Sequence, residues 1–190
     1  MPARGTGEPG QPGRAVFLDR DGTLIVDRHY LGDPDGVELL PGAREGIERL
    51  RELGYGLFLF TNQSGIGRGW ITRAQVDACN RRTELLLGLE EGFAGVGVAP
   101  ERPDEPAVYR KPSPRYLREC LERFPLDPAA CWMVGDQPRD IEAGRAAGIG
   151  AARILEGVHR CPETGARAFP DLGAFARWRA AEEERGGHHG

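Results

Sequence analysis

The stretch RAVFLDRDGT, residues 14–23, joins a short apolar run to a cluster of acidic, basic and small residues. The run from Arg14 to Leu18 has the apolar character expected of a strand buried in a parallel sheet. Asp19 and Asp21 follow it directly and are separated by Arg20. The stretch therefore predicts a buried strand whose carboxyl end carries two acidic side chains.

Short apolar runs alternate with segments of helical period, a pattern typical of a parallel sheet with helices on both faces. Further strands are expected at Tyr55 to Phe60, Phe93 to Val98, Cys131 to Val134 and Ala151 to Leu155. Helices are expected after Pro41-Gly42, after the N-cap Thr72, around Tyr116 to Phe124, from about Pro138 to Ala147, and, as a short terminal helix, around Phe175 and Trp178. The predicted fold class is α/β, a Rossmann-like three-layer sandwich with a central parallel sheet.

Composition and charge exclude several classes to which the protein could belong. The chain is 39% hydrophobic and 28% charged, and its apolar runs are far too short to span a bilayer. A net charge of -4 argues against non-specific attraction to nucleic acid or to an anionic membrane. Without a signal segment, a cytoplasmic location is expected. The four cysteines lack the paired spacing of a metal or redox motif, so small core residues are expected at Cys79, Cys120, Cys131 and Cys161.

The ends of the chain differ in composition from its middle. Residues 1–13 are rich in Gly and Pro and predict a disordered leader, whereas residues 182–190 are charged and glycine-rich and predict a flexible tail. His188 and His189 in that tail are assigned no role. Residues 14–181 are expected to form a single domain, since the length suits one sizeable core.

Polar clusters follow three of the predicted strands. Asp19 to Thr23 follows the first, Thr61 to Gly65 the second, and Gly135-Asp136 the strand at Cys131. In open α/β sheets, ligands bind at the carboxyl ends of the strands. We therefore expect these three clusters to converge on one site.

The chemistry of the clusters favours phosphoryl transfer. Asp19 and Asp21 repel each other by about 4 kcal/mol at 4 Å and an effective dielectric near 20, so a cation is expected between them. Asp136 adds a third carboxylate and makes an all-oxygen set that suits magnesium. An isolated Asp-x-Asp is more often a turn or a helix cap. Together with Thr61 and Lys111, however, the acidic residues supply a nucleophile, an acid/base, a metal site and an oxyanion clamp.

These residues resemble the four motifs of the haloacid dehalogenase-like phosphatases, in order and over about Ala15 to Leu155. The motifs are Asp19-Arg20-Asp21-Gly22-Thr23, Thr61-Asn62, Lys111, and Gly135-Asp136 with Asp140. The sequence around these motifs is similar to that of the D-glycero-D-manno-heptose 1,7-bisphosphate 7-phosphatases. The similar segments are Ile25 to Tyr30, Thr61 to Arg68 and Arg110-Lys111-Pro112. Histidinol-phosphate phosphatases are the nearest neighbours in the same subfamily.

The resemblance implies a role for each motif. Asp19 would be the nucleophile that forms an aspartyl-phosphate, and Asp21 the general acid and base. Magnesium would be held by the carboxylates of Asp19 and Asp136 and the main-chain carbonyl of Asp21. Thr61 and Lys111 would hold the transferring phosphoryl group, and Asp140 would orient the Lys111 ammonium or support the metal. Substrate contacts would come from Arg20, Asp27, Arg28, His29, Tyr30, Asn62, Gln63, Ser64 and Arg110, with Arg110 gripping a second phosphate. For His29 and Tyr30 the alternative is that they pack the loop.

One departure from the subfamily concerns zinc. Many members carry a Cys-x-His and Cys-x-Cys zinc loop before the lysine motif, whereas Val98 to Tyr109 contains no Cys or His. Structural zinc is therefore not expected, and three prolines are expected to restrict this loop instead. The short segments between Asp21, Thr61 and Lys111 leave no room for a cap domain. An open, capless site in a monomer is expected, with selectivity set by the loops at His29-Tyr30 and Pro100 to Tyr109.

The leading prediction is magnesium-dependent hydrolysis of a phosphate monoester on a small phosphorylated sugar, namely the 7-phosphate of heptose 1,7-bisphosphate. The first alternative is histidinol phosphate as substrate. The second, from another class, is an inactive module that binds a sugar phosphate without cleaving it.

Overall fold

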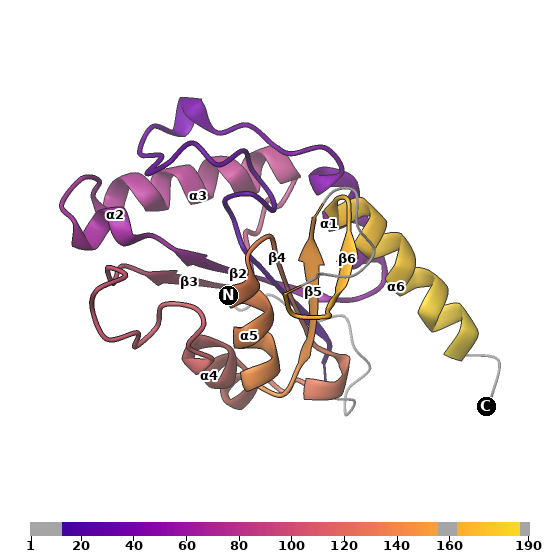
Figure 1. Ribbon diagram of the computed structural model, residues 1–190. Helices are drawn as coiled ribbons and strands as arrows, with labels where there is room; N and C mark the ends of the chain where they lie inside the picture. Colours follow the sequence, from indigo (N-terminus) through magenta and orange to yellow (C-terminus); the bar gives the residue numbers. More distant parts are fainter. Residues whose placement is uncertain (1–12, 156–162, 187–190) are drawn as a thin grey trace.

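A six-stranded, fully parallel sheet in the order β3-β2-β1-β4-β5-β6 forms the centre of the computed structural model (Figure 1). The structure describes residues 13–155 and 163–186. The strands are β1 (Ala15–Leu18), β2 (Gly56–Asn62), β3 (Gly95–Ala99), β4 (Trp132–Gly135), β5 (Gly150–Ile154) and β6 (Arg167–Phe169). All four residues of the central β1 are buried, which accounts for its continuous apolar run.

Alternate residues of β1 serve two separate cores. Val16 and Leu18 belong to a cluster with residues of α1 (Ala43–Glu52), α3 (Arg73–Leu87) and α6 (Leu172–Gly186). Ala15 and Phe17 point to the opposite face and pack with residues of α4 (Arg115–Arg123) and α5 (Pro138–Ala146). Helices thus cover both faces of the sheet, and α3 and α4 can be seen on opposite sides of it (Figure 1). The predicted three-layer α/β class is confirmed.

Short helices complete the chain between these elements. They are α2 (Ser64–Gly67), directly after β2, and the 3-10 helices η1 (Pro34–Gly36) and η2 (Pro128–Ala130). Thr72 caps α3 as predicted, because its hydroxyl accepts a hydrogen bond from Gln75 N and its own N–H donates to the Gln75 side chain. Within the described residues, no helix is both long and apolar enough to cross a membrane.

The carboxyl-terminal part differs most from the expectation. β6 was not predicted, since three residues with an exposed arginine form no apolar run. The terminal helix is 15 residues long and not short, and it continues past Glu182 into the segment predicted as a tail. Most of the predicted leader, Cys161 and residues 187–190 lie outside the described residues.

Candidate active site

Three neighbouring strands end side by side and bring the polar clusters together. Leu18 pairs in register with Leu59 of β2 and with Val134 of β4. Asp19 therefore lies beside the carboxyl ends of both neighbours, which carry Thr61 and Asp136. Because the sheet is parallel throughout, these ends share one edge.

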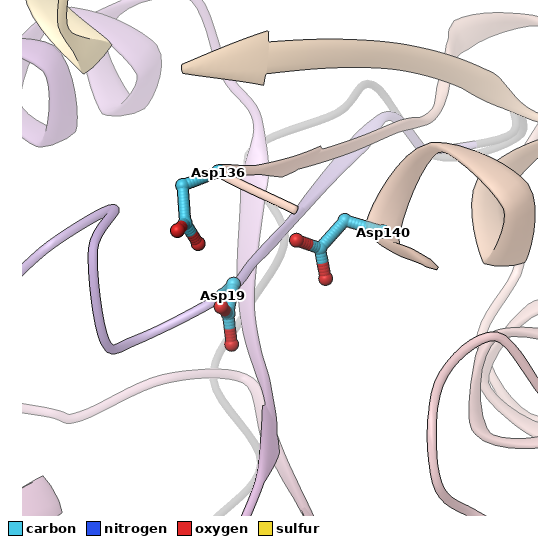
Figure 2. A group of neighbouring side chains, drawn as sticks. All are labelled: Asp19, Asp136 and Asp140. Carbon is cyan, nitrogen blue, oxygen red and sulfur yellow. The ribbon is translucent and has the colours of Figure 1, made fainter. Parts of the chain in front are cut away.

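Three carboxylates converge at this edge. Figure 2 shows the side chains of Asp19, Asp136 and Asp140 gathered in one place, and one oxygen from each lies within 4.8 Å of the others. Burial and the charge of Asp19 raise the pKa of Asp136 to about 7. The Oδ1 atom of Asp136 is buried and has no hydrogen-bond partner within the described residues. An unpartnered oxygen in a cluster of like charges fits a hard divalent cation, which binds oxygen ligands.

Glycines beside the cluster allow this close approach. A Cβ on Gly135 would lie 2.2 Å from Asp140 Oδ2, and one on Gly22 would lie 2.6 Å from Asp136 Oδ2. Gly22 also has a φ of +82°, a conformation that side chains disfavour. Both carboxylates therefore depend on glycine for their positions.

Lys111 neutralises two of the carboxylates. Its Nζ lies 2.7 Å from Asp19 Oδ1 and 2.7 Å from Asp140 Oδ1, and it donates a hydrogen bond of 2.7 Å to the Phe60 carbonyl oxygen. Burial lowers the pKa of Lys111, but the two carboxylates raise it by more, so the net shift is upward and the ammonium remains charged. Two ion pairs and one hydrogen bond together fix the position of the ammonium. Asp140 thus lies where it can serve either role that the sequence predicts for it.

Asn62 joins β2 to the loop that carries Lys111. Its side-chain oxygen accepts a hydrogen bond of 2.9 Å from Lys111 N, and its amide donates one of 3.2 Å to Lys111 O. Asn62 was predicted as a substrate contact, and it also borders the cleft described below. These two bonds give it a second task, which is to hold the Lys111 backbone in place.

Asp21 lies in a hydrogen-bond network with Gln63 and Arg20. Gln63 Nε2 donates to Asp21 Oδ2 at 2.7 Å and also approaches Thr61 Oγ1 at 2.9 Å. Burial raises the pKa of Asp21 and outweighs the opposing effect of Arg20. A carboxyl group that keeps its proton at a pH closer to neutral is suited to general acid catalysis.

The Arg20 side chain, which was predicted to contact substrate, does not line the cleft. Its side chain is 0% exposed, and its guanidinium binds Asp21 at 3.0 Å and Asn80 of α3 at 2.9 Å. Arg20 supports Asp21 from behind the site. The physical reason is that Asn80 supplies a buried partner from a distant helix, which lets a charged side chain lie in the interior.

A cleft of about 240 Å³ opens over the cluster. Of the predicted residues, its lining includes Asp19, Asp21, Asp27, His29, Tyr30, Asn62, Gln63, Ser64, Arg110, Lys111 and Asp136. Thr61 and Asp140 are fully buried and do not line it, and Arg28 pairs with Glu38 outside it. Gln137, Arg139 and Pro103 line the cleft without having been predicted. The first two could have been found from their position just after Asp136, and Pro103 lies in the loop expected to set selectivity.

His29 and Tyr30 form one wall of the cleft with left-handed backbone angles, φ +48° and φ +56°. Such conformations are unfavourable for residues with side chains and are retained where packing fixes them. The Tyr30 ring contacts the Trp70 ring edge-on at 4.7 Å and covers Gly65. Tyr30 thus both packs the loop and borders the cleft.

Side-chain contacts hold the proline-rich loop on the other side of the cleft. Glu101 accepts a hydrogen bond from Tyr109 N, and the Tyr109 hydroxyl donates to Glu119 at 2.8 Å. The Arg115 guanidinium lies over the Tyr109 ring, 4.7 Å from its centroid, and binds Glu119. These contacts tie the loop to α4 next to Arg110.

Comparisons with known proteins agree with this geometry. Residues 26–148 match the family model of the haloacid dehalogenase-like hydrolases. D-glycero-beta-D-manno-heptose-1,7-bisphosphate 7-phosphatase of Yersinia pestis is 37% identical over 150 residues, which cover 74% of this chain and 79% of that protein. The enzyme of the same name from Escherichia coli K12 is 31% identical, with 86% of each chain covered. The crystal structure of D,D-heptose 1,7-bisphosphate phosphatase from B. bronchiseptica, complexed with magnesium and phosphate, has a TM-score of 0.78 at 30% identity and covers 89% of this chain and 99% of that one.

Proposed function

Because the chain belongs to the haloacid dehalogenase-like hydrolases, we propose that it removes the 7-phosphate of D-glycero-D-manno-heptose 1,7-bisphosphate through a phosphorylated Asp19. That it is a phosphatase follows from its family and its similarity to named heptose bisphosphate phosphatases. One observation carries the proposed mechanism: the Asp19 carboxylate lies at the edge of the cleft, 2.7 Å from a buried Lys111. The β anomer, named for the relatives, is the form we propose as substrate.

The first half of the reaction forms a bond between Asp19 and phosphorus. An oxygen of the Asp19 carboxylate attacks the 7-phosphoryl group, and the bond between phosphorus and the sugar oxygen breaks. Asp21 donates its proton to the departing oxygen, which leaves as the sugar hydroxyl. Lys111 and Thr61 hold the transferring group and stabilise the negative charge on the phosphoryl oxygens.

The second half regenerates the enzyme. Asp21, now a carboxylate, takes a proton from water as the water oxygen attacks phosphorus. The bond between Asp19 and phosphorus breaks, and inorganic phosphate leaves. The short segments around the cleft leave it open to water, which favours hydrolysis over transfer to another acceptor.

We propose magnesium as the cofactor, held by the carboxylates of Asp19 and Asp136 and the main-chain carbonyl of Asp21. When bound, the ion would offset the repulsion between Asp19 and the phosphate dianion. The unpartnered Asp136 Oδ1 and the all-oxygen donor set support this choice. A cytoplasmic location and a monomeric state remain predictions from the sequence.

Magnesium should stabilise the fold. We expect millimolar Mg²⁺ to raise the melting temperature by several degrees relative to EDTA, because bound ligand stabilises by mass action and relieves the repulsion of the carboxylates. Asp136→Asn should abolish most of this shift, whereas Asp77→Asn, outside the cleft on α3, should retain it. Thermal unfolding followed by circular dichroism measures both. An equal Mg²⁺ shift in wild type and Asp136→Asn would contradict the proposed metal site.

The substrate is tested by side-by-side turnover with Mg²⁺. We expect kcat/KM for heptose 1,7-bisphosphate to exceed that for histidinol phosphate by at least about 100-fold, which corresponds to two or more ionic contacts to the second phosphate. Release of inorganic phosphate measures both reactions. Faster hydrolysis of histidinol phosphate would favour the alternative substrate, and absence of any hydrolysis would favour the inactive binding module.

A further inference from the structure

Arg139 is a cation of the cleft to which the predicted reaction assigns no task. It follows Asp136 by three positions, on the first turn of α5, and its side chain lines the same cleft as Arg110. Within residues 13–155 and 163–186, the Arg139 side chain has no hydrogen bond, ion pair or ring contact. Its neighbour Gln137, by contrast, already has a hydrogen-bond partner, because the Gln137 amide donates to Asp136 Oδ2. Arg139 is thus free to bind a ligand in the cleft.

Arg110 is in a similar position. Its guanidinium donates one hydrogen bond of 3.3 Å to the Glu101 carbonyl oxygen, and it forms no ion pair with any described carboxylate. Arg110 and Arg139 line the same cleft, and burial together with the charge of Arg139 lowers the pKa of Arg110. Two like charges that line one cleft without a counterion are unfavourable, and an anion between them would reverse the sign of the interaction.

The lysine and the arginines that line the cleft fall into two groups. Lys111 is paired with Asp19 and Asp140 beside the reacting carboxylate. Arg110 and Arg139 have no such partners and together carry two positive charges. A phosphate monoester carries up to two negative charges near pH 7, and a guanidinium presents donors in a fork that matches two phosphate oxygens. The unpaired arginines match one phosphate in charge and in hydrogen bonding.

We propose that Arg139 acts with Arg110 to bind the phosphate that is not cleaved, and that Arg139 is therefore a specificity-determining residue for bisphosphates. This inference rests on the proposed function and adds a residue to it. Arg139 does not take part in bond breaking. Its removal should affect recognition of the second phosphate and leave the chemistry at Asp19 unchanged.

The test compares bisphosphate and monophosphate substrates that share the cleavable group. Arg139→Gln should raise KM for heptose 1,7-bisphosphate about tenfold to a hundredfold with little change in kcat, and should leave both constants for heptose 7-phosphate nearly unchanged. Arg139→Lys should recover part of the loss, since it keeps the charge but not the fork. Arg145→Gln is the matched control, because Arg145 lies on the same helix and donates to Thr164 O, outside the cleft.

A binding measurement separates this inference from the identity of the substrate. In an Asp19→Asn background, calorimetry with glucose 1,6-bisphosphate and glucose 6-phosphate gives the preference for a second phosphate without turnover. Loss of that preference in the further variant Arg139→Gln supports the inference even if heptose bisphosphate proves not to be the substrate. An unchanged preference, or an equal loss of affinity for both ligands, overturns it while leaving the proposed function standing.

Discussion

Replacing Asp19 by Asn should abolish hydrolysis, with kcat lowered by at least about 10⁴-fold, because loss of a covalent nucleophile removes the main route of the reaction. An amide at this position cannot form the acyl phosphate. The fold should persist, since Lys111 keeps its ion pair with Asp140 and its hydrogen bond to Phe60 O. Release of inorganic phosphate measures the rate, and circular dichroism checks the fold.

The matched control for this variant is Asp77→Asn. It makes the same chemical change on α3, where Asp77 pairs with Arg73 away from the cleft, and it should leave the rate unchanged. Phosphate binding to the Asp19→Asn protein should largely persist, because Lys111 remains in place. Full activity in the Asp19→Asn variant would show that another group is the nucleophile.

Lys111→Met should have the largest combined effect on stability and rate. The change leaves Asp140, which is fully buried, and Asp19 without their counterion, so the free energy of unfolding should fall by about 3–5 kcal/mol. The rate should fall by about 10²–10³-fold, as expected when a charged stabiliser of the transition state is removed. Urea unfolding in EDTA measures the first quantity, and phosphate release with Mg²⁺ measures the second.

A double-mutant cycle checks the cause of the destabilisation. Adding Asp140→Asn to Lys111→Met removes one of the uncompensated carboxylates, so the double variant should be more stable than the sum of the single effects predicts. The rate should not recover, because the ammonium is still missing. Strict additivity of the two stability changes would mean that the measured loss does not come from the ion pair.

The sequence predicted the strands that carry the site, but it placed the end of β2 two residues too early. β2 was expected to stop at Phe60, where the apolar run ends, yet it continues through Thr61 and Asn62. Their pairing with Val98 and Ala99 of β3 sustains the strand, and a single segment does not reveal its neighbour's register. β6 escaped prediction for a similar reason, since a three-residue edge strand is defined by its partner β5 and not by its own pattern.

Side-chain environments were harder to predict than strand ends. The family resemblance implied that Arg20 contacts substrate, whereas its side chain is fully buried. Its burial depends on Asn80, 60 positions away in sequence, and the approach of that helix is a property of the tertiary fold. The same limit explains why Arg139 was not predicted. Its proposed role rests on the lack of side-chain partners among the described residues, which only the folded chain reveals. Motif residues, by contrast, converge as expected because β1, β2 and β4 end at one edge.

The buried ammonium has a practical consequence for measuring motion in this protein. Lys111 is the single lysine among the 190 residues, so reagents that acylate lysine have one side-chain target. Acylation requires an accessible, neutral amine, whereas this one is 2% exposed and held charged by two carboxylates. The rate of labelling at this position, followed by mass spectrometry, therefore reports how often the floor of the cleft opens.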